Sequence, residues 1–569
     1  MKARAVALRP AVGALMAAEA AALAAFVALP PHRAGWWPAT GISAAALVVL
    51  IVTVYRRNAP GWVAAWARHR RRRRQPVPVA AAVDVPHGAI VCGVRVDEYE
   101  AVTMIKASGR PYAPTLLRGS TRSLTTNVIP MAVLAGLLDQ PGFLQLAGID
   151  IVSAGQRVRG VGGYAPLYST LLADRPAAGR RDTYLIVRID ITGSVPGLTY
   201  RTSIGAAAAA ATERIINALL QNGIRATALS AAELDTALSE LGVGLVTPPP
   251  RPEPPAPDQA ADEAQAAPAV AVPVGAHRGA AAPRTRWRSV RTREGYLSSY
   301  YFSPEDITTA ALNRMWALHT DEVVQTTSIC KHRNTEPDGG GPVLVSAMVR
   351  TCDPQEAPQP PTLDLNPLPG EQYAATVRAA PTARPAITLP ARRLNGAEPL
   401  QIPIGATGIL VGAALKDDPD ADPPIQLDDM VMLALTDPDR ATRISMNTSE
   451  FYVRQLLIRA AAVGERIVIY SHQPTRWNSL TQPNIAVAER RRPPPFVPTI
   501  TVNDRPTALS AAGLSATVIS LGPLADDGPT PDLRFVQTSD SVVHVSTPTQ
   551  SMQIAIVAFR QEQAWMGLT

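Results

Sequence analysis

Residues 41–55 read GISAAALVVLIVTVY and contain no charged side chain. Together with Trp36 and Trp37 this segment reaches about 20 residues, the length at which an apolar helix crosses a bilayer. Residues 11–29 form a second apolar segment, rich in alanine and with a single acidic residue. The two segments predict a hairpin of two transmembrane helices over residues 1–57.

The segment that follows is strongly basic. Between residues 56 and 83 there are eight arginines and no acidic residue, and the positive-inside rule places such a flank in the cytoplasm. Residues 1–10 are basic as well, so we expect a multi-pass protein of the inner (cytoplasmic) membrane with two helices and both termini cytoplasmic. A cleaved signal peptide is the alternative for the first segment. The predicted membrane-interface residues, in contact with lipid, are Trp36, Trp37, Arg56, Arg57, Arg70, Arg71, Arg72, Arg73 and Arg74.

The first apolar segment carries candidates for helix pairing. Helices in lipid associate through close contact of small side chains, which makes Ala18 and Ala22 candidates. Glu19 lies between them, and a polar group in a membrane helix gains stability when it finds a partner. We interpret Glu19 as a protonated or partner-facing carboxyl, in preference to an ion site.

The composition narrows the function classes. The net charge is +7, but without the eight arginines 46 basic residues face 47 acidic ones, so no basic face for nucleic acid is predicted. The three cysteines have no C-x-x-C spacing, and Cys330 with His332 falls short of the four ligands of a structural zinc site. No metal or cofactor is therefore predicted. The excess of arginine, alanine and proline is typical of a GC-rich, actinobacterial-type genome.

Beyond the hairpin, folded segments alternate with proline-rich ones. Strand and helix signals alternate as in a covered sheet: strands at 149–152, 183–191 and 224–229, a helix from Ser203 that ends at Asn222 and Gly223, and a helix over 231–241 opened by a capping box of Ser230 and Glu233. The predicted domains are an arginine-rich linker (58–83), an α/β domain (84–247), a proline-rich linker or insertion (248–283), the continuation of the α/β domain (284–353), a second proline-rich linker (354–385), a second α/β module (386–492) and a β-rich C-terminal region of antiparallel strands (493–569).

Catalytic motifs are mostly missing. None of the four lysines follows a glycine, which excludes a P-loop ATPase, and there is no G-x-S-x-G or H-E-x-x-H. The strand 430–435 ends before Asp437-Pro438-Asp439, a pattern that could hold a metal-nucleotide as in a glycosyltransferase. We favour a polar turn, so no catalytic, cofactor-binding or metal residue is predicted.

Five runs of the sequence carry a resemblance to a known family: GIDIVSAGQRVRGV (148–161), YAPLYSTLL (164–172), RRDTYLIVRID (180–190), TERI (212–215) and GIRATALSAAEL (223–234). Two shorter runs, AAAVG at 460–464 and QPTRW at 473–477, add a looser likeness over residues 386–490. Together they resemble the EccE family, whose members are membrane-complex subunits of mycobacterial ESX (type VII) secretion systems. The resemblance covers residues 1–350 well, and the two predicted amino-terminal helices support it.

The resemblance implies a non-enzymatic scaffold subunit that presents cytoplasmic domains to EccB, EccC and EccD, of which EccC is the ATPase. It transfers no functional residues. Two alternatives remain from the sequence: a membrane-tethered, glycosyltransferase-like enzyme built on the strand before Asp437, and a membrane-anchored regulatory binding module.

Overall fold

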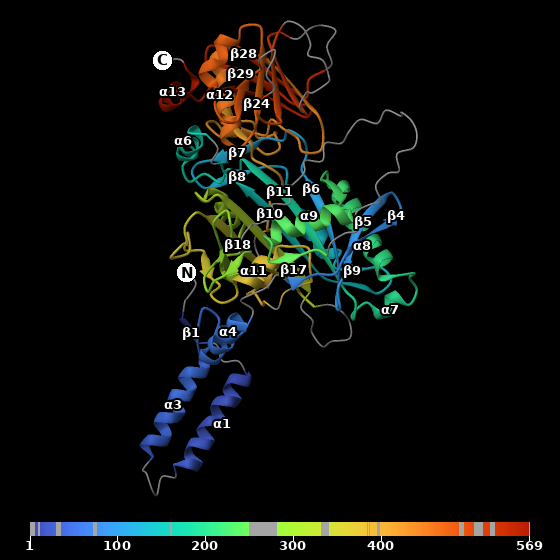
Figure 1. The fold of residues 1–569 in the computed structure, drawn as a ribbon, viewed down its shortest axis with the longest axis vertical. Helices are drawn as coiled ribbons and strands as arrows, with labels where there is room; N and C mark the ends of the chain where they lie inside the picture. The colour runs from blue at the N-terminus through green and yellow to red at the C-terminus, as the bar shows by residue number, and fades with distance from the viewer. Residues whose placement is uncertain are drawn as a thin grey trace.

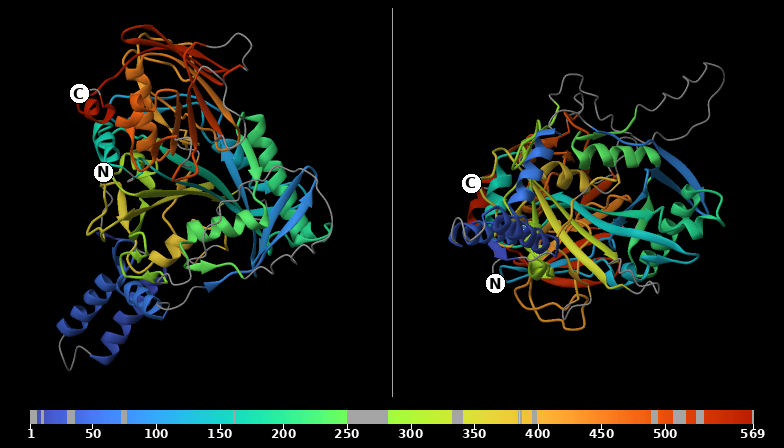
Figure 2. Two further views of the ribbon diagram at one scale, coloured as in Figure 1. Left: turned by 45° about the horizontal axis from the view of Figure 1, so that its top comes forward. Right: turned by 90° about the horizontal axis from the view of Figure 1, so that it is seen from below.

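The protein is a mixed α/β protein, as the sequence predicts, and a two-helix hairpin projects from its two-sheet body (Figure 1). The left view of Figure 2 shows the hairpin standing clear of that body. The computed structural model describes residues 6–8, 12–29, 36–71, 77–159, 162–249, 282–331, 341–383, 385, 387–394, 399–488, 494–505, 516–523 and 530–567. Most of the proline-rich segment 248–283 therefore lies outside the described residues.

The hairpin consists of α1 (Val12–Ala28) and α3 (Trp37–Ile51), which pack against each other. Helix α3 ends four residues before Tyr55 because β2 (Val52–Val54) is extended and pairs with β1 (Val6–Leu8). At 1.5 Å per residue, α1 and α3 are about 26 and 23 Å long, against about 30 Å of bilayer hydrocarbon. Across the described part of the chain, no helix has both the length and the apolar character that a membrane crossing requires. The predicted pair of membrane-spanning helices is therefore not supported.

The first sheet forms the lower part of the body, and all of its strand pairs are antiparallel. Strands on both sides of the 248–283 segment belong to it, with β10 at its centre between β11 and β17. In the described residues its order is β14 (Arg284–Thr285), β15 (Val290–Arg291), β16 (Tyr296–Phe302), β18 (Val343–Asp353), β17 (Glu322–Lys331), β10 (Leu144–Gln156), β11 (Arg180–Asp190), β6 (Glu100–Ser108), β5 (Ile90–Val96) and β4 (Ala82–His87), with β9 (Asp139–Gln140), β12 (Arg225–Ala228), β19 (Leu365–Pro367) and β20 (Arg392–Arg393) paired at its margins.

Two helices pack on this sheet, and both confirm their local sequence signals. Helix α8 (Ile204–Gln221) begins at the N-cap Ser203 and ends before Asn222, and its alanines are buried against β4, β5 and β6, where small side chains allow a close approach. Helix α9 (Ala231–Gly242) opens with the predicted capping box of Ser230 and Glu233. Shorter helices complete this half: α5 (Met131–Gly136), α7 (Val195–Leu198), α10 (Thr309–Arg314) and α11 (Gln372–Arg378).

The second sheet forms the end of the body opposite the hairpin (Figure 1). Helix α12 (Glu450–Ala462) connects its parallel strands β23 and β24 and is buried along nearly all its length. The order is β25 (Ile485–Val487), β24 (Ile467–Ser471), β26 (Ile500–Asp504), β27 (Thr517–Leu521), β23 (Thr442–Asn447), β28 (Leu533–Ser539), β29 (Val542–Ser546), β30 (Ser551–Ala555), β21 (Ile409–Ala414), β22 (Met430–Leu433), β7 (Thr115–Arg118) and β8 (Arg122–Leu124).

The prediction of antiparallel strands at the C-terminal end is only partly right. Strands β28, β29 and β30 are antiparallel, but β26 and β27 pair in parallel with β24 and β23. The physical reason is that the period-2 apolar pattern of a strand records which face is buried and not the direction of its neighbour.

The two sheets interlock. Strands β7 and β8 follow β6 of the first sheet in the chain but pair into the second sheet. Helix α6 (Tyr164–Leu171), which lies between β10 and β11 in the chain, packs on α12 and places Tyr164 and Tyr168 in the core of the second sheet. The first half of the chain thus contributes two strands and one helix to the second sheet.

Candidate functional site

The hairpin joins the body through a compact polar and aromatic contact. Arg56 and Arg57 both pair with Glu371 at the start of α11, at 2.8 Å between Arg56 Nη2 and Glu371 Oε2. All three side chains are largely buried. Helix α4 (Ala59–Arg71) continues the contact, because Trp62 and His69 lie 6.0 and 5.4 Å, centroid to centroid, from the ring of Trp287. Two of the arginines predicted to meet lipid are therefore engaged with the body.

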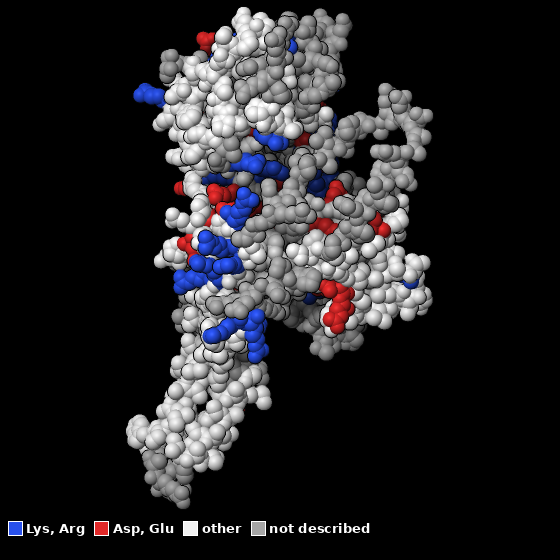
Figure 3. Space-filling model, in the orientation of Figure 1, with Lys and Arg blue, Asp and Glu red and all other residues white. Residues whose placement is uncertain are grey.

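The other predicted interface residues are distributed along the hairpin. Trp36 and Trp37 are exposed at the start of α3, with their rings stacked 3.9 Å apart. Arg70 and Arg71 are exposed on α4, and Arg70 lies over the ring of Trp66. On the face in Figure 3 the described part of the hairpin shows no charge, and blue residues gather where it meets the body. Arg72, Arg73 and Arg74 lie outside the described residues.

The pairing candidates on α1 differ in their surroundings. Ala18 is buried, Ala22 is half-buried and Glu19 is exposed. Since α1 packs on α3, where Ala39 is buried, the alanine face of α1 forms the seam of the hairpin. Glu19 is exposed beside this seam and has no ion pair with any residue that the structure describes.

The Asp437-Pro438-Asp439 sequence forms a turn, as predicted, closed by a bridge between Asp437 and Arg440. Arg225 of β12 binds the Asp437 carboxylate through two hydrogen bonds, at 3.1 and 2.9 Å. Lys106 of β6 donates to Asp439 Oδ1 at 2.8 Å. Both carboxylates are thus neutralised by cations of the same chain, which leaves neither as a ready ligand for a metal-nucleotide.

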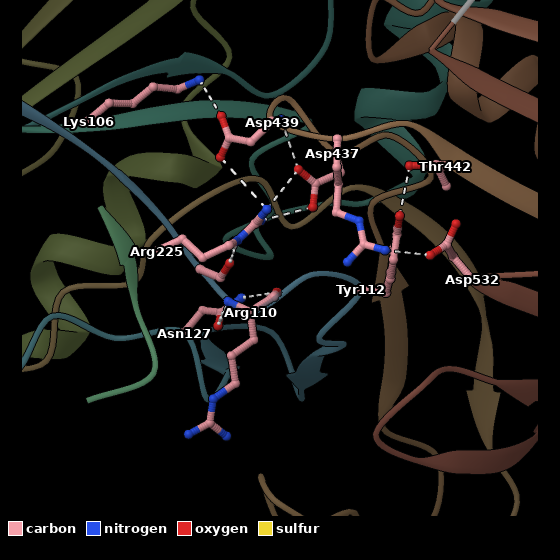
Figure 4. A network of polar contacts seen from close by, with 11 residues as sticks. Lys106, Arg110, Tyr112, Asn127, Arg225, Asp437, Asp439, Thr442 and Asp532 are labelled. Atoms are coloured by element: carbon pink, nitrogen blue, oxygen red, sulfur yellow. Dashed lines mark hydrogen bonds and ion pairs between the residues drawn. The ribbon is translucent and has the colours of Figure 1, made fainter. Parts of the chain in front are cut away.

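These contacts belong to a network that connects the two sheets (Figure 4). Figure 4 shows Arg225 reaching the Asp437 turn, while the Arg110 guanidinium points away from it. Burial alone would raise the pKa of Asp439, but hydrogen bonds from Lys106 and Ser108 outweigh it and hold that pKa below its ordinary value. Asp439 is therefore ionised, and its ion pair with Lys106 holds the turn against the first sheet.

A cavity of about 540 Å³ lies beside this network, lined by both sheets. Besides Lys106 and Arg225, its lining includes five further arginines, against three acidic residues. No group of three His, Cys, Asp or Glu side chains suited to a metal occurs among the described residues. The five arginines are Arg110, Arg159, Arg180, Arg181 and Arg466.

Cysteine chemistry is also disfavoured. Cys92 and Cys352 are buried, and burial raises the pKa of Cys92 to about 11 and that of Cys352 to about 12. A thiol with so high a pKa remains protonated and is a poor nucleophile. These two cysteines act as small apolar residues of the core.

Sequence reasoning missed the cavity cations because they come from distant parts of the chain. Lys106 lies near the end of β6 and Arg225 begins β12, so the two residues are more than one hundred positions apart in the chain, yet β12 pairs with β6. One signal was available: Lys106 is one of only four lysines and directly follows the largely apolar run VTMI at 102–105.

Comparison with known proteins gives consistent matches. Residues 177–302 match the family described as "Putative type VII ESX secretion system translocon, EccE". The ESX-2 secretion system protein EccE2 of Mycobacterium tuberculosis (strain CDC 1551 / Oshkosh) is 29% identical over 468 residues, which cover 81% of this chain and 76% of that protein. The ESX-5 secretion system protein EccE5 of Mycobacterium marinum (strain ATCC BAA-535 / M) is 26% identical, over 66% of this chain and 87% of its own. The ESX-1 secretion system protein EccE1 of Mycobacterium tuberculosis (strain CDC 1551 / Oshkosh) is 30% identical over 27% of this chain and 34% of its own.

Proposed function

The chain belongs to the EccE family of type VII (ESX) secretion system components, and on this premise we propose that it is a non-enzymatic scaffold subunit of the secretion complex. In this role the hairpin attaches the protein to the cytoplasmic membrane, and the two-sheet body presents surfaces to EccB-, EccC- and EccD-like subunits. The observation that carries the proposal is the pair of buried ion pairs by which Arg56 and Arg57 bind Glu371. It fixes an apolar hairpin to a folded body, as a scaffold requires.

The surface of the hairpin supports membrane attachment. Large apolar side chains on α1 and α3 are exposed although the two helices pack together, a pattern expected of a surface covered by lipid or by another subunit. They include Met16, Leu23, Val27, Trp37, Leu47 and Val48. Exposed arginines follow on α4, where anionic headgroups attract them.

We predict that the body faces the cytoplasm and that the tip of the hairpin faces outward, because eight arginines at the base oppose translocation. Trp36→Cys and Tyr200→Cys, each in a background without the three native cysteines, test this orientation, since both positions are exposed. An impermeant thiol reagent should label position 36 in intact cells and position 200 only after lysis. The reverse labelling would refute the orientation.

We predict that Asp437→Asn with Asp439→Asn preserves both assembly and secretion. The change removes the charges that face Lys106 and Arg225, so it should lower the free energy of unfolding by about 2 kcal/mol. The same change in a turn without ion pairs would cost less. Tagged protein extracted in mild detergent should still co-purify with EccB-, EccC- and EccD-like subunits.

The matched control is Asp540→Asn, on an exposed turn. Secretion lost in the double variant while the complex stays assembled at normal abundance would favour the enzyme alternative. Wild-type protein that co-purifies with none of these subunits would contradict the scaffold role itself.

A further inference from the structure

We propose that the cavity between the two sheets binds a small molecule that carries a di- or triphosphate group. This inference goes beyond the proposed scaffold role and does not depend on it. The cavity, of about 540 Å³, falls within the range of small-molecule sites. Both sheets line it, so a ligand there would contact the two halves of the body at once.

The charge of the cavity is unbalanced. Asp437 and Asp439 neutralise Lys106 and Arg225, and Asp182 pairs with Arg180. Three arginines of the lining, Arg159, Arg181 and Arg466, form no ion pair with any described residue, and the third acidic residue of the lining, Glu465, accepts a hydrogen bond from Thr436. The cavity therefore holds guanidinium groups to which no described residue supplies a counter-charge.

Arg181 makes the strongest case, because it is more than nine-tenths buried. Its Nε donates to the Gly405 carbonyl at 2.6 Å, and its guanidinium lies over the ring of Trp316. Burial lowers the pKa of Arg181 to about 9, with no carboxylate to oppose the shift. A buried charge without a partner is costly, and a bound anion would remove that cost.

The backbone leaves room for a second guanidinium. Gly464 has φ +106°, and a Cβ there would lie 2.9 Å from Cδ of Arg159. Glycine at 464 thus allows both the positive φ and the position of the Arg159 side chain. Several guanidinium groups around one cavity match the oxygens of a polyphosphate, because each planar fork can donate two hydrogen bonds to a phosphate.

Calorimetric titration of the full chain in detergent tests the proposal, with sodium triphosphate, ATP and adenosine as probes. Triphosphate and ATP should bind and should raise the melting temperature, whereas adenosine should do neither. Equal affinities of triphosphate and ATP would mean that the protein recognises the phosphates alone. Tighter binding of ATP would mean that the nucleoside contributes as well. Both results support the proposal. Raising the ionic strength to about 1 M should weaken the binding.

Arg159→Ala with Arg466→Ala should weaken triphosphate binding on the order of 100-fold, about tenfold for each charged hydrogen bond. Neither side chain is tied to a described residue, so the variant should melt like the wild type before ligand is added. The matched control is Arg122→Ala with Arg534→Ala, two exposed arginines outside the cavity, and it should bind as the wild type does.

Three results would overturn the proposal. The first is that about 1 mM triphosphate produces neither binding heat nor a change in melting temperature, since a Kd of about 1 mM corresponds to only about 4 kcal/mol of binding free energy. The second is unchanged affinity in the Arg159 and Arg466 variant. The third is a polyglutamate peptide that binds more than tenfold tighter than triphosphate, which would assign the cavity to an acidic protein segment.

Discussion

Glu562→Ala should lower the free energy of unfolding of the second-sheet half by about 3–5 kcal/mol, the cost of leaving a buried charge unpaired. The Glu562 and Arg459 side chains are fully buried and form an ion pair at 2.8 Å between Arg459 Nη2 and Glu562 Oε2. Gln455 and Tyr164 donate to the same carboxylate. The contact fastens the C-terminal turn Arg560–Glu562 to α12 and α6, so its loss should release the end of the chain.

Urea unfolding of wild type and variant measures this effect. Glu450→Ala is the matched control, because Glu450 also pairs with arginines, Arg454 and Arg476, but its side chain is about one-third exposed. An exposed pair contributes about 1 kcal/mol or less. If the two variants lost equal stability, the buried Arg459–Glu562 pair would not stabilise the C-terminal turn in the way that we infer.

The same carboxylate should make stability depend on pH. Burial by itself would raise the pKa of Glu562, but the hydrogen bonds and charge of Arg459 outweigh it and hold the pKa below the ordinary value of 4.5. The stability that Glu562 contributes is thus present above that value and is lost as the pH falls through the lower folded pKa. The difference between wild type and Glu562→Gln should accordingly shrink at acid pH.

Ala18→Leu with Ala22→Leu should abolish most co-purification with EccB- and EccD-like subunits. Ala18 is buried and Ala22 half-buried on α1, where larger side chains would push α1 away from α3. Helices in lipid rely on such close contact, since no hydrophobic force drives them together there. On our proposal that the hairpin attaches to the membrane, attachment itself should persist because leucine favours the bilayer.

Ala17→Leu with Ala24→Leu is the matched control, because it adds the same two side chains to exposed positions of α1. We expect it to co-purify normally. Co-purification of the Ala18 and Ala22 variant at the wild-type level would mean that the body alone makes the assembly contacts. Glu19, exposed beside the seam, remains our proposed contact to a partner helix.

Much of the local structure could be predicted because its causes are local. The N-cap Ser203, the capping box of Ser230 and Glu233, and the turn at Asp437 depend on hydrogen bonds between residues only a few positions apart. The apolar hairpin followed by arginines is also a contiguous pattern. Such features are encoded within a window of a few residues, so sequence reasoning can find them.

Other features depend on partners that are remote in the chain. Helix α3 stops at Ile51 because the next three residues pair with Val6–Leu8. Helix α12 carries the chain across between β23 and β24, and β26 and β27 pair in parallel with these strands. Arg56 and Arg57 carry the charge expected of a membrane flank, but Glu371, more than three hundred residues away, is where they bind.

The sequence by itself determined the mixed α/β class, the caps of α8 and α9, the apolar hairpin with its basic flank and the resemblance to the EccE family. Only the tertiary structure decided that Arg56 and Arg57 bind the body, that Lys106 and Arg225 neutralise the Asp437 turn, and that a cavity gathers three arginines without an ion pair to any described residue. The physical reason is that the energy of a charged side chain depends on the groups within about 4 Å of it. Here those groups come from strands that lie far apart in the chain.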